Sequence, residues 1–499
     1  MSFKIAFIGA GSIGFTRKLI SDLLTVPEFD DLEIALMDIS AQNLDMIRQL
    51  VERDVQGNGL HSVRVTHTTD QVEAVADAKY VVNVARVGGL DAFKQDVEIP
   101  LKYGIDQCVG DTLCAGGIFY GQRGIPMILD LCEDIHAHAA DDCMMLNYAN
   151  PNAMMTWAAN HYGDVYTLGL CHGVQGGHRL IADALGLQKD EVDIICAGIN
   201  HQTWYIQIRH DGEDLTGRLL EALENHPKYR EQEKVRIDML RRFGYFSTES
   251  NGHLSEYVPW YRKREDEIKD WICLNAWIQG ETGGYLRVCT EGRNWFETDF
   301  PNWMKQPPME FKPEARSQEH GSFIIEGLET GRLYRGHFNV VNNGVITNLD
   351  DDAIVEVPCY VDGNGINIPL VGDLPMGCAA VCDVSINVQR LSVEAAVHGD
   401  DILLRQALMM DPLTGAVCNP PEIWQLADEM LVAEAQWLPQ YGDAIAEAKE
   451  RLAKGPRIPT RDGYQGAARL KTKTVEEMAA DREASTKSAA AADKANMTE

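Results

Sequence analysis

Three features of the sequence predict an α/β protein. A glycine-rich turn follows a short apolar run near the N-terminus, apolar runs and amphipathic segments alternate to about residue 200, and the alternation then breaks down. We therefore expect an N-terminal Rossmann-type doubly wound sheet at residues 1–198. A mixed α+β region for catalysis and oligomerisation should follow at 199–469, and a helical or disordered tail at 470–499.

The glycine-rich turn has the sequence of a dinucleotide-binding fingerprint. The apolar run Lys4–Ile8 leads into a Gly-x-Gly-x-x-Gly segment, a helical segment follows, and a second run, Leu32–Met37, ends at an acid. Gly9 should permit the tight turn, Gly11 the approach of a pyrophosphate and Gly14 close packing of helix on strand. An acid at this distance favours NAD over NADP. The alternative is a glycine turn of an unrelated α/β protein. The expected cofactor-binding residues of this segment are Gly9, Gly11, Ser12, Ile13, Gly14 and Asp38.

Polar residues follow several later strands, where a doubly wound sheet binds its ligands. Asn83 lies near the end of the buried run Tyr80–Ala85 and Arg86 follows that run. Both are candidate cofactor or substrate contacts, although Arg86 could equally be a solvated loop charge.

Two further loops are candidates for substrate binding. Asp111 opens a loop with two adjacent glycines, expected to precede a helix and to let a ligand approach the backbone; the alternative is an ordinary loop. Asn150 could bind sugar hydroxyls through its amide, or cap the helix that begins near Pro151.

A cysteine and two histidines lie at the ends of the next strands. Cys171 and His172 follow the run Val165–Leu170, and His201 follows Ile194–Ile199. A thiolate and an imidazole with positions left open suit a catalytic divalent transition metal. Read singly, each residue is more often part of a core.

The second half of the chain gives weaker signals. The polar and aromatic segment Gly244–Tyr261 is typical of a substrate-lining loop, or of an interdomain contact. The other expected elements are helices within Leu215–Arg242 and at Ser317–Thr330, Cys378–Met410 and Pro421–Trp437, and strands at His201–Ile208, Tyr334–Val341, Val345–Asn348 and Ala353–Tyr360.

Composition restricts the class of partner. Of the 499 residues 24% are charged, and the formal net charge of −30 argues against nucleic acid and anionic membranes. No apolar run has the length of a membrane span, and no signal peptide is visible. Twelve cysteines without framework spacing indicate reduced thiols, so we expect a cytoplasmic protein.

As a set, these motifs resemble glycoside hydrolase family 4, and most of all its melibiase-type α-galactosidases, over roughly residues 3–441. The likeness rests on motifs in a shared order: Phe7–Ser12, Asp111–Leu113, Asn147–Pro151, Gly169–His172, Gly198–His201, Glu256–Tyr257, Val355–Cys359, Asn387–Gln389 and Met409–Pro412. The chain departs from relatives at Cys114-Ala115 and at Gln318–Gly321, so another hexoside, such as an α-galacturonide, stays open as the substrate.

The resemblance implies an NAD- and Mn²⁺-dependent glycosidase, commonly a homodimer or homotetramer. It implies Cys171 and His201 as metal ligands, Tyr257 as the base that deprotonates C2, and His172 as the acid or a substrate ligand. NAD would oxidise the sugar at C3, the glycosidic bond would break by elimination, and water addition and re-reduction would complete the cycle. The rival interpretations are a sugar or hydroxy-acid dehydrogenase and a non-enzymatic NAD-binding regulator.

Overall fold

One sheet runs through the molecule. The structure is a computed structural model that describes residues 2–454 and 458–484. Within these ranges thirteen strands join the sheet in the order β10-β8-β7-β12-β11-β6-β5-β4-β1-β2-β3, with β13 beside β12 and β9 beside β8. The strands are β1 (Ser2–Ile8), β2 (Asp31–Met37), β3 (Arg64–Thr68), β4 (Tyr80–Asn83), β5 (Met144–Asn147), β6 (Thr167–Gly169), β7 (Asp193–Ile199), β8 (Gln202–His210), β9 (Glu213–Asp214), β10 (Phe246–Ser247), β11 (Tyr334–Val341), β12 (Ile354–Asp362) and β13 (Gly365–Asn367).

The first six strands are parallel and have the order 3-2-1-4-5-6. This is the strand order of a doubly wound dinucleotide-binding sheet, so the expected α/β fold is confirmed. Strands β1 and β4 end in unbroken buried runs, as expected for parallel strands covered on both faces.

The remaining strands are antiparallel and continue the same sheet. β11 pairs with β6 through Asn339 and Gly169, and β12 pairs with β7 through Glu356 and Gly198. β7 and β8 then form a hairpin. The parallel and antiparallel parts therefore meet at β6, which ends two residues before Cys171.

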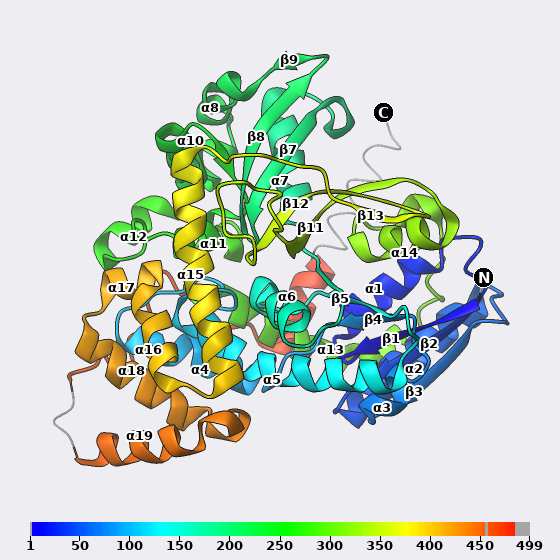
Figure 1. Cartoon of the computed structure of the whole chain (residues 1–499), viewed down its shortest axis with the longest axis horizontal. Helices are drawn as coiled ribbons and strands as arrows, with labels where there is room; N and C mark the ends of the chain where they lie inside the picture. The colour runs from blue at the N-terminus through cyan, green and yellow to red at the C-terminus, as the bar shows by residue number, and fades with distance from the viewer. Residues whose placement is uncertain (1, 455–457, 485–499) are drawn as a thin grey trace.

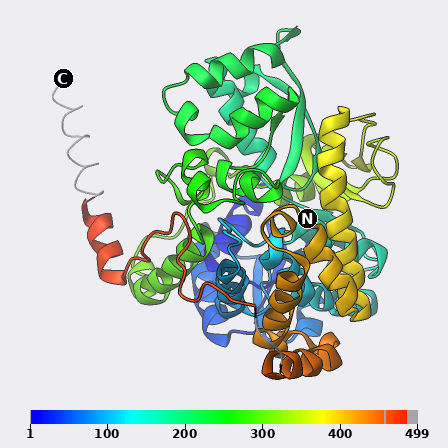
Figure 2. The same cartoon turned by 90° about the vertical axis from the view of Figure 1, so that its left-hand side faces the viewer.

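Helices cover the sheet and extend beyond it (Figures 1 and 2). α5 contacts α4, α6 and α15, whereas α1 contacts α2 and α14. The α-helices are α1 (Ile13–Leu23), α2 (Ala41–Gly57), α3 (Gln71–Val75), α4 (Gly89–Lys102), α5 (Cys114–His138), α6 (Asn152–His161), α7 (Gly173–Leu185), α8 (Thr216–Asn225), α9 (Tyr229–Gln232), α10 (Lys234–Phe243), α11 (Asn251–Tyr257), α12 (Glu265–Trp271), α13 (Gly284–Trp303), α14 (His320–Thr330), α15 (Met376–His398), α16 (Asp401–Met410), α17 (Pro412–Val417), α18 (Pro420–Ala433) and α19 (Gly442–Lys454).

The main hydrophobic core joins the two parts of the sheet. Phe7 and Leu146 of the parallel strands belong to the same buried cluster as Phe338 and Val357 of the antiparallel strands. A second cluster, which includes Ile181, lies between the β7–β8 hairpin and helices α7, α8 and α10.

Two expected elements are wrong in the second half. The helix expected over 378–410 is two helices, because Gly399 adopts a φ of +64° and Asp400 caps α16 through the N–H groups of Ile402 and Leu403. The strand expected over 345–348 is a set of turns, because the side chain of Asn342 bonds to the backbone there in place of a neighbouring strand.

The segment expected as a substrate-lining loop is partly regular. Residues 246–247 form β10 and residues 251–257 form α11. Ser250 caps α11, because its side chain accepts a hydrogen bond from the His253 N–H. Of the expected tail, residues 475–484 are helical and lie beside α13 (Figure 2), where Glu291 accepts a hydrogen bond from the Lys473 N–H. Residues 485–499 lie outside the described residues.

Two further features of the structure concern the cysteines and the membrane-spanning potential of the helices. All twelve cysteines are free thiols, as the absence of framework spacing predicts. Among the described helices, none combines the length and the apolar composition that a membrane crossing requires.

Candidate active site

The glycine-rich turn joins β1 to α1 as its motif requires. Gly9 has a φ of +83°, and a Cβ there would lie 2.6 Å from the Cα of Ala85. The N–H of Gly11 donates to Asp38 Oδ2 at 2.7 Å, and a Cβ at Gly11 would lie 2.5 Å from that oxygen. Gly11 therefore lets Asp38 approach the turn, a constraint that the expected role in pyrophosphate binding did not include.

The N-terminus of α1 is open to an anion. Ser12 occupies the N-cap without a capping hydrogen bond from its side chain, and the first turn contains no acidic residue. The expected packing role of Gly14 is wrong, because a Cβ there would meet no atom within 4 Å. Ile13 and Gly14 thus begin a helix whose first N–H groups are free to bind a phosphate.

Asn83 lies inside the protein. Its side chain is fully buried, its amide nitrogen donates to Asn147 Oδ1 at 2.9 Å, and its oxygen accepts a hydrogen bond from the Ala85 N–H. It therefore joins the carboxyl ends of β4 and β5.

Arg86, Asp111 and Asn150 meet at the same edge of the sheet. The Arg86 guanidinium lies 4.5 Å from the ring centre of Phe93, and its Nη2 atom lies 3.6 Å from Asp111 Oδ2, so Arg86 is not a solvated loop charge. The Asn150 amide donates to Asp111 Oδ2 at 3.0 Å and does not cap α6, for which Pro151 is the N-cap.

The two glycines that follow Asp111 are not part of a ligand-binding loop. α5 begins at Cys114, so Gly116 and Gly117 belong to the helix. A Cβ on either would meet backbone atoms, 2.6 Å from Asp96 O and 2.4 Å from Thr112 C. Their lack of a side chain therefore serves packing within the protein.

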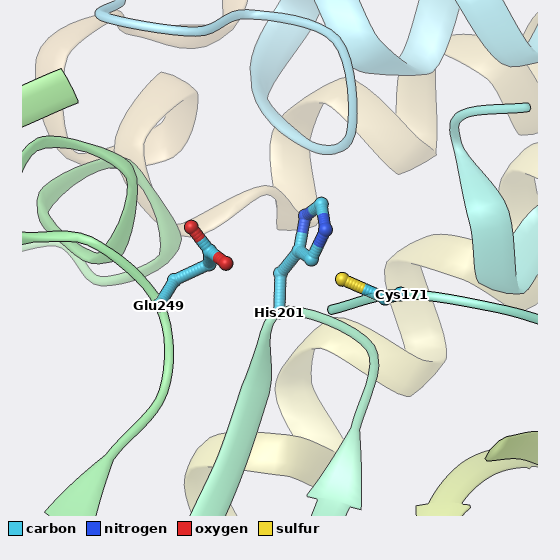
Figure 3. Close-up of side chains that lie close together, drawn as sticks. All are labelled: Cys171, His201 and Glu249. Atoms are coloured by element: carbon cyan, nitrogen blue, oxygen red, sulfur yellow. The ribbon is translucent and has the colours of Figure 1, made fainter. Parts of the chain in front are cut away.

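Three potential metal ligands converge (Figure 3). Cys171 follows β6, His201 lies in the β7–β8 turn and Glu249 follows β10, and one donor atom of each lies within 4.8 Å of the others. A Cβ at Gly173 would lie 2.8 Å from Glu249 Oε1, so the first residue of α7 leaves room for this carboxylate. The sequence indicated Cys171 and His201, but Glu249 was hidden in a segment noted only for its polarity.

Burial determines the protonation of two of these groups. It raises the pKa of the Cys171 thiol well above its ordinary value, and the carboxylates of Glu356 and Glu249 act in the same direction. Burial lowers the pKa of His201 to about 4, so the imidazole is neutral near pH 7. A neutral imidazole is ready to bind a metal, and a bound dication would favour the thiolate.

Behind His201 lies a row of buried groups on α11. His201 Nδ1 is 2.9 Å from His253 Nε2, and His253 Nδ1 is 2.9 Å from Glu256 Oε2. The next residue, Tyr257, is buried, with its ring centre 5.1 Å from that of His253. Its hydroxyl has no hydrogen-bond partner among the described residues, and burial raises its pKa well above the ordinary value.

His172 is the N-cap residue of α7 and stays accessible. Its side chain is 69% exposed, and its Nδ1 atom lies 3.7 Å from Oε1 of the buried Glu319. The imidazole therefore adjoins the three converging ligands through Cys171 while remaining open to a substrate.

Comparisons with known proteins define the class. The profile of the family 4 glycosyl hydrolases matches residues 4–187, and that of the family 4 C-terminal domain matches 196–414. The chain therefore belongs to the family 4 glycosyl hydrolases and is a glycoside hydrolase, as its motifs predict.

One curated relative and two solved structures show which members of the family the chain is similar to. The chain is 57% identical to an α-galactosidase of Rhizobium meliloti (strain 1021), over 97% of this chain and 98% of that protein. It is also similar to a solved 6-phospho-α-glucosidase from gut microorganisms in complex with NAD and glucose-6-phosphate (25% identity, TM-score 0.73, 88% and 99% covered). A 6-phospho-β-glucosidase of Thermotoga maritima, solved with manganese, NAD⁺ and glucose-6-phosphate, shares the fold (24% identity, TM-score 0.71, 87% and 99% covered).

Proposed function

We propose that this protein hydrolyses α-galactosides with the help of NAD and a divalent transition metal such as Mn²⁺. The observation that carries the proposal is the convergence of Cys171, His201 and Glu249, in a chain 57% identical to an α-galactosidase. A thiolate, an imidazole and a carboxylate fit a catalytic metal site that keeps positions open for substrate.

The N-terminal turn suits NAD. The free N–H groups at the start of α1, at Ile13 and Gly14, would hold the pyrophosphate beside Gly9 and Gly11. Asp38 would accept hydrogen bonds from a ribose and disfavour the 2′-phosphate of NADP. The similar 6-phospho-α-glucosidase that was solved in complex with NAD supports NAD as the cofactor.

The chemistry divides between the bound groups and the side chains. When bound at the N-terminus of α1, NAD would supply reversible hydride transfer at C3 of the sugar, and a metal held by Cys171, His201 and Glu249 would polarise the C3 oxygen. Tyr257 takes the C2 proton on its phenolic oxygen. Burial raises the pKa of this phenol, and a dication bound nearby would lower it again. His172 gives a proton to the glycosidic oxygen as that bond breaks, and water then adds at C1.

The charges around the site support a neutral sugar. Glu249, Asp111 and the buried Glu319 are carboxylates, with Arg86 as the cation beside Asp111. A uronate would add a further negative charge to this group. We therefore favour a galactoside over the α-galacturonide, and assign Asn150 and Asp111 to its hydroxyls.

A four-way assay tests the proposal. The protein is stripped of cofactor and metal and given nitrophenyl α-galactoside with neither addition, NAD⁺ alone, Mn²⁺ with reductant alone, or both. Release of nitrophenol that needs both additions, without net NADH, is the expected result. Stoichiometric NADH would favour a dehydrogenase, and release without either addition would refute the mechanism. Release from the α-galacturonide but not from the galactoside would refute the choice of sugar.

A further inference from the structure

In the row of buried groups behind His201, the donor and the acceptor of each hydrogen bond can be assigned. His253 is 3% exposed and Glu256 2% exposed, so their hydrogen bonds are made to protein atoms. Glu256 Oε1 accepts the N–H groups of Cys108 and of Val109, the latter at 2.7 Å. A carboxylate group accepts hydrogen bonds, as Oε1 does from two N–H groups, so the contact of Oε2 with His253 places a proton on His253 Nδ1.

The next contact follows from the chemistry of imidazole. A neutral imidazole that donates from Nδ1 presents a lone pair at Nε2. Burial lowers the pKa of His253, but the hydrogen bond and charge of Glu256 raise it overall, so this assignment applies to the neutral form of His253. Its Nε2 then accepts a hydrogen bond from His201 Nδ1 across their 2.9 Å contact. His201, neutral and protonated at Nδ1, then has its own lone pair at Nε2.

A second contact gives the same assignment for His201 independently. The Thr112 hydroxyl donates its single proton to Asp111 Oδ1 at 2.9 Å. The hydroxyl oxygen consequently presents a lone pair to His201 Nδ1, 3.3 Å away. His201 Nδ1 thus faces two acceptors, His253 Nε2 and the Thr112 hydroxyl oxygen, and each contact is a hydrogen bond only if Nδ1 carries a proton.

We propose that His253 and Glu256 are positioning residues that hold His201 in the Nδ1-protonated tautomer and so keep its Nε2 lone pair available to the metal. The proposal rests on the proposed function, since it assumes a metal at Cys171 and His201. It gives a supporting role to two residues of α11 that are not among the three potential metal ligands.

A substitution that preserves the shape of Glu256 tests which groups donate and which accept in this row of hydrogen bonds. In Glu256→Gln, the N–H groups of Cys108 and Val109 still require an acceptor, so the amide oxygen stays at the Oε1 position. The NH₂ group then faces His253 Nδ1 and donates to it. His253 must donate from Nε2, His201 must accept at Nδ1, and the proton on His201 moves to Nε2, where it blocks the metal.

We expect Glu256→Gln to weaken Mn²⁺ binding about 10- to 100-fold, the usual effect of losing such a supporting contact. Calorimetric titration of the metal-free protein measures it, and an unchanged NAD affinity shows that the variant is folded. The matched control is Glu281→Gln, a buried glutamate bonded to Arg287, which should bind Mn²⁺ as the wild type does.

Substitutions of His253 separate positioning from bulk structure. His253→Gln retains an oxygen that can accept a hydrogen bond from His201 Nδ1, so it should bind Mn²⁺ within about threefold of the wild type. His253→Leu has no acceptor, so its Mn²⁺ affinity should fall as far as that of Glu256→Gln. Equal or tighter binding by Glu256→Gln or His253→Leu would overturn the proposal. Failure of the wild type itself to bind Mn²⁺ would instead remove the metal site, and with it the proposed function.

Discussion

At the scale of single residues, the site depends on groups that burial makes hard to charge. The Cys171 thiol has a raised pKa in the protein alone, and a bound dication would reverse that preference. Their positions at strand ends made Cys171 and His201 candidates, and the resemblance to family 4 implied them as the metal ligands. Glu249 could not be predicted in the same way, because nothing local marks an acid 48 residues beyond His201 as its spatial neighbour.

Cys171→Ser should therefore weaken Mn²⁺ binding by more than about tenfold, since a direct ligand should matter at least as much as its supporting contacts. Calorimetry on the metal-free protein measures the affinity. Cys143→Ser, at a partly buried thiol before β5, is the control. Equal affinities of the two variants would contradict Cys171 as a ligand.

The buried Glu356 should make the stability of the protein depend on pH. Burial, and then the charge of Glu249, raises the pKa of Glu356 to about 8 from an ordinary 4.5. Between these values the folded protein keeps a proton that the unfolded chain releases. The stabilising contribution of Glu356 is thus complete below pH 4.5 and declines by about 1.4 kcal/mol per unit until pH passes 8.

Glutamine does not titrate, so the stability of Glu356→Gln relative to the wild type should rise from pH 5 to pH 8. Denaturant unfolding of both metal-free proteins at the two pH values gives the difference. A difference that stays constant with pH would show that Glu356 is ionised in the folded protein throughout this range.

At the scale of elements, α7 brings its first residue against Glu249, a proposed metal ligand. Gly173→Ala would place a Cβ 2.8 Å from Glu249 Oε1 and displace this carboxylate, whereas a Cβ at Gly176 in the same helix meets no atom within 4 Å. We expect Gly173→Ala to weaken Mn²⁺ binding several-fold, and Gly176→Ala to retain affinity and gain up to about 1 kcal/mol of stability. Equal Mn²⁺ affinities in the two variants would argue against Glu249 as a ligand.

The sequence predicted elements best where one local pattern determines them. β1, β2 and β11 match their apolar runs, because buried strands need such runs whatever surrounds them. The errors lie where a side chain replaces backbone pairing, as at Asn342, or where a polar segment folds as a helix because it packs inside the protein, as α11 does. Those arrangements depend on distant partners, which local patterns do not reveal.

At the scale of the whole molecule, the C-terminal segment is attached through a buried ion pair. Asp106 pairs with Arg262 and also accepts the Ala467 N–H at 2.8 Å. Deleting 458–499 removes that donor from a buried carboxylate, together with the hydrogen bonds of the Ile458 and Ala468 N–H groups, and should lower the free energy of unfolding by at least about 1–3 kcal/mol. Deleting 470–499 leaves the contact intact and is the control. Equal stability of the two truncated proteins, measured by denaturant unfolding, would contradict this role.

The place of β11 between β6 and β12 has a consequence during synthesis. β6 is complete at Gly169, but its partner in the sheet is made only at Tyr334–Val341, so the ribosome must add at least 334 − 169 = 165 residues before β6 loses its open edge. At about 5–20 residues per second this takes roughly 8 to 33 seconds. For that time the nascent chain exposes an unpaired strand beside Cys171, the proposed metal ligand, and chaperones or neighbouring nascent chains could engage this surface.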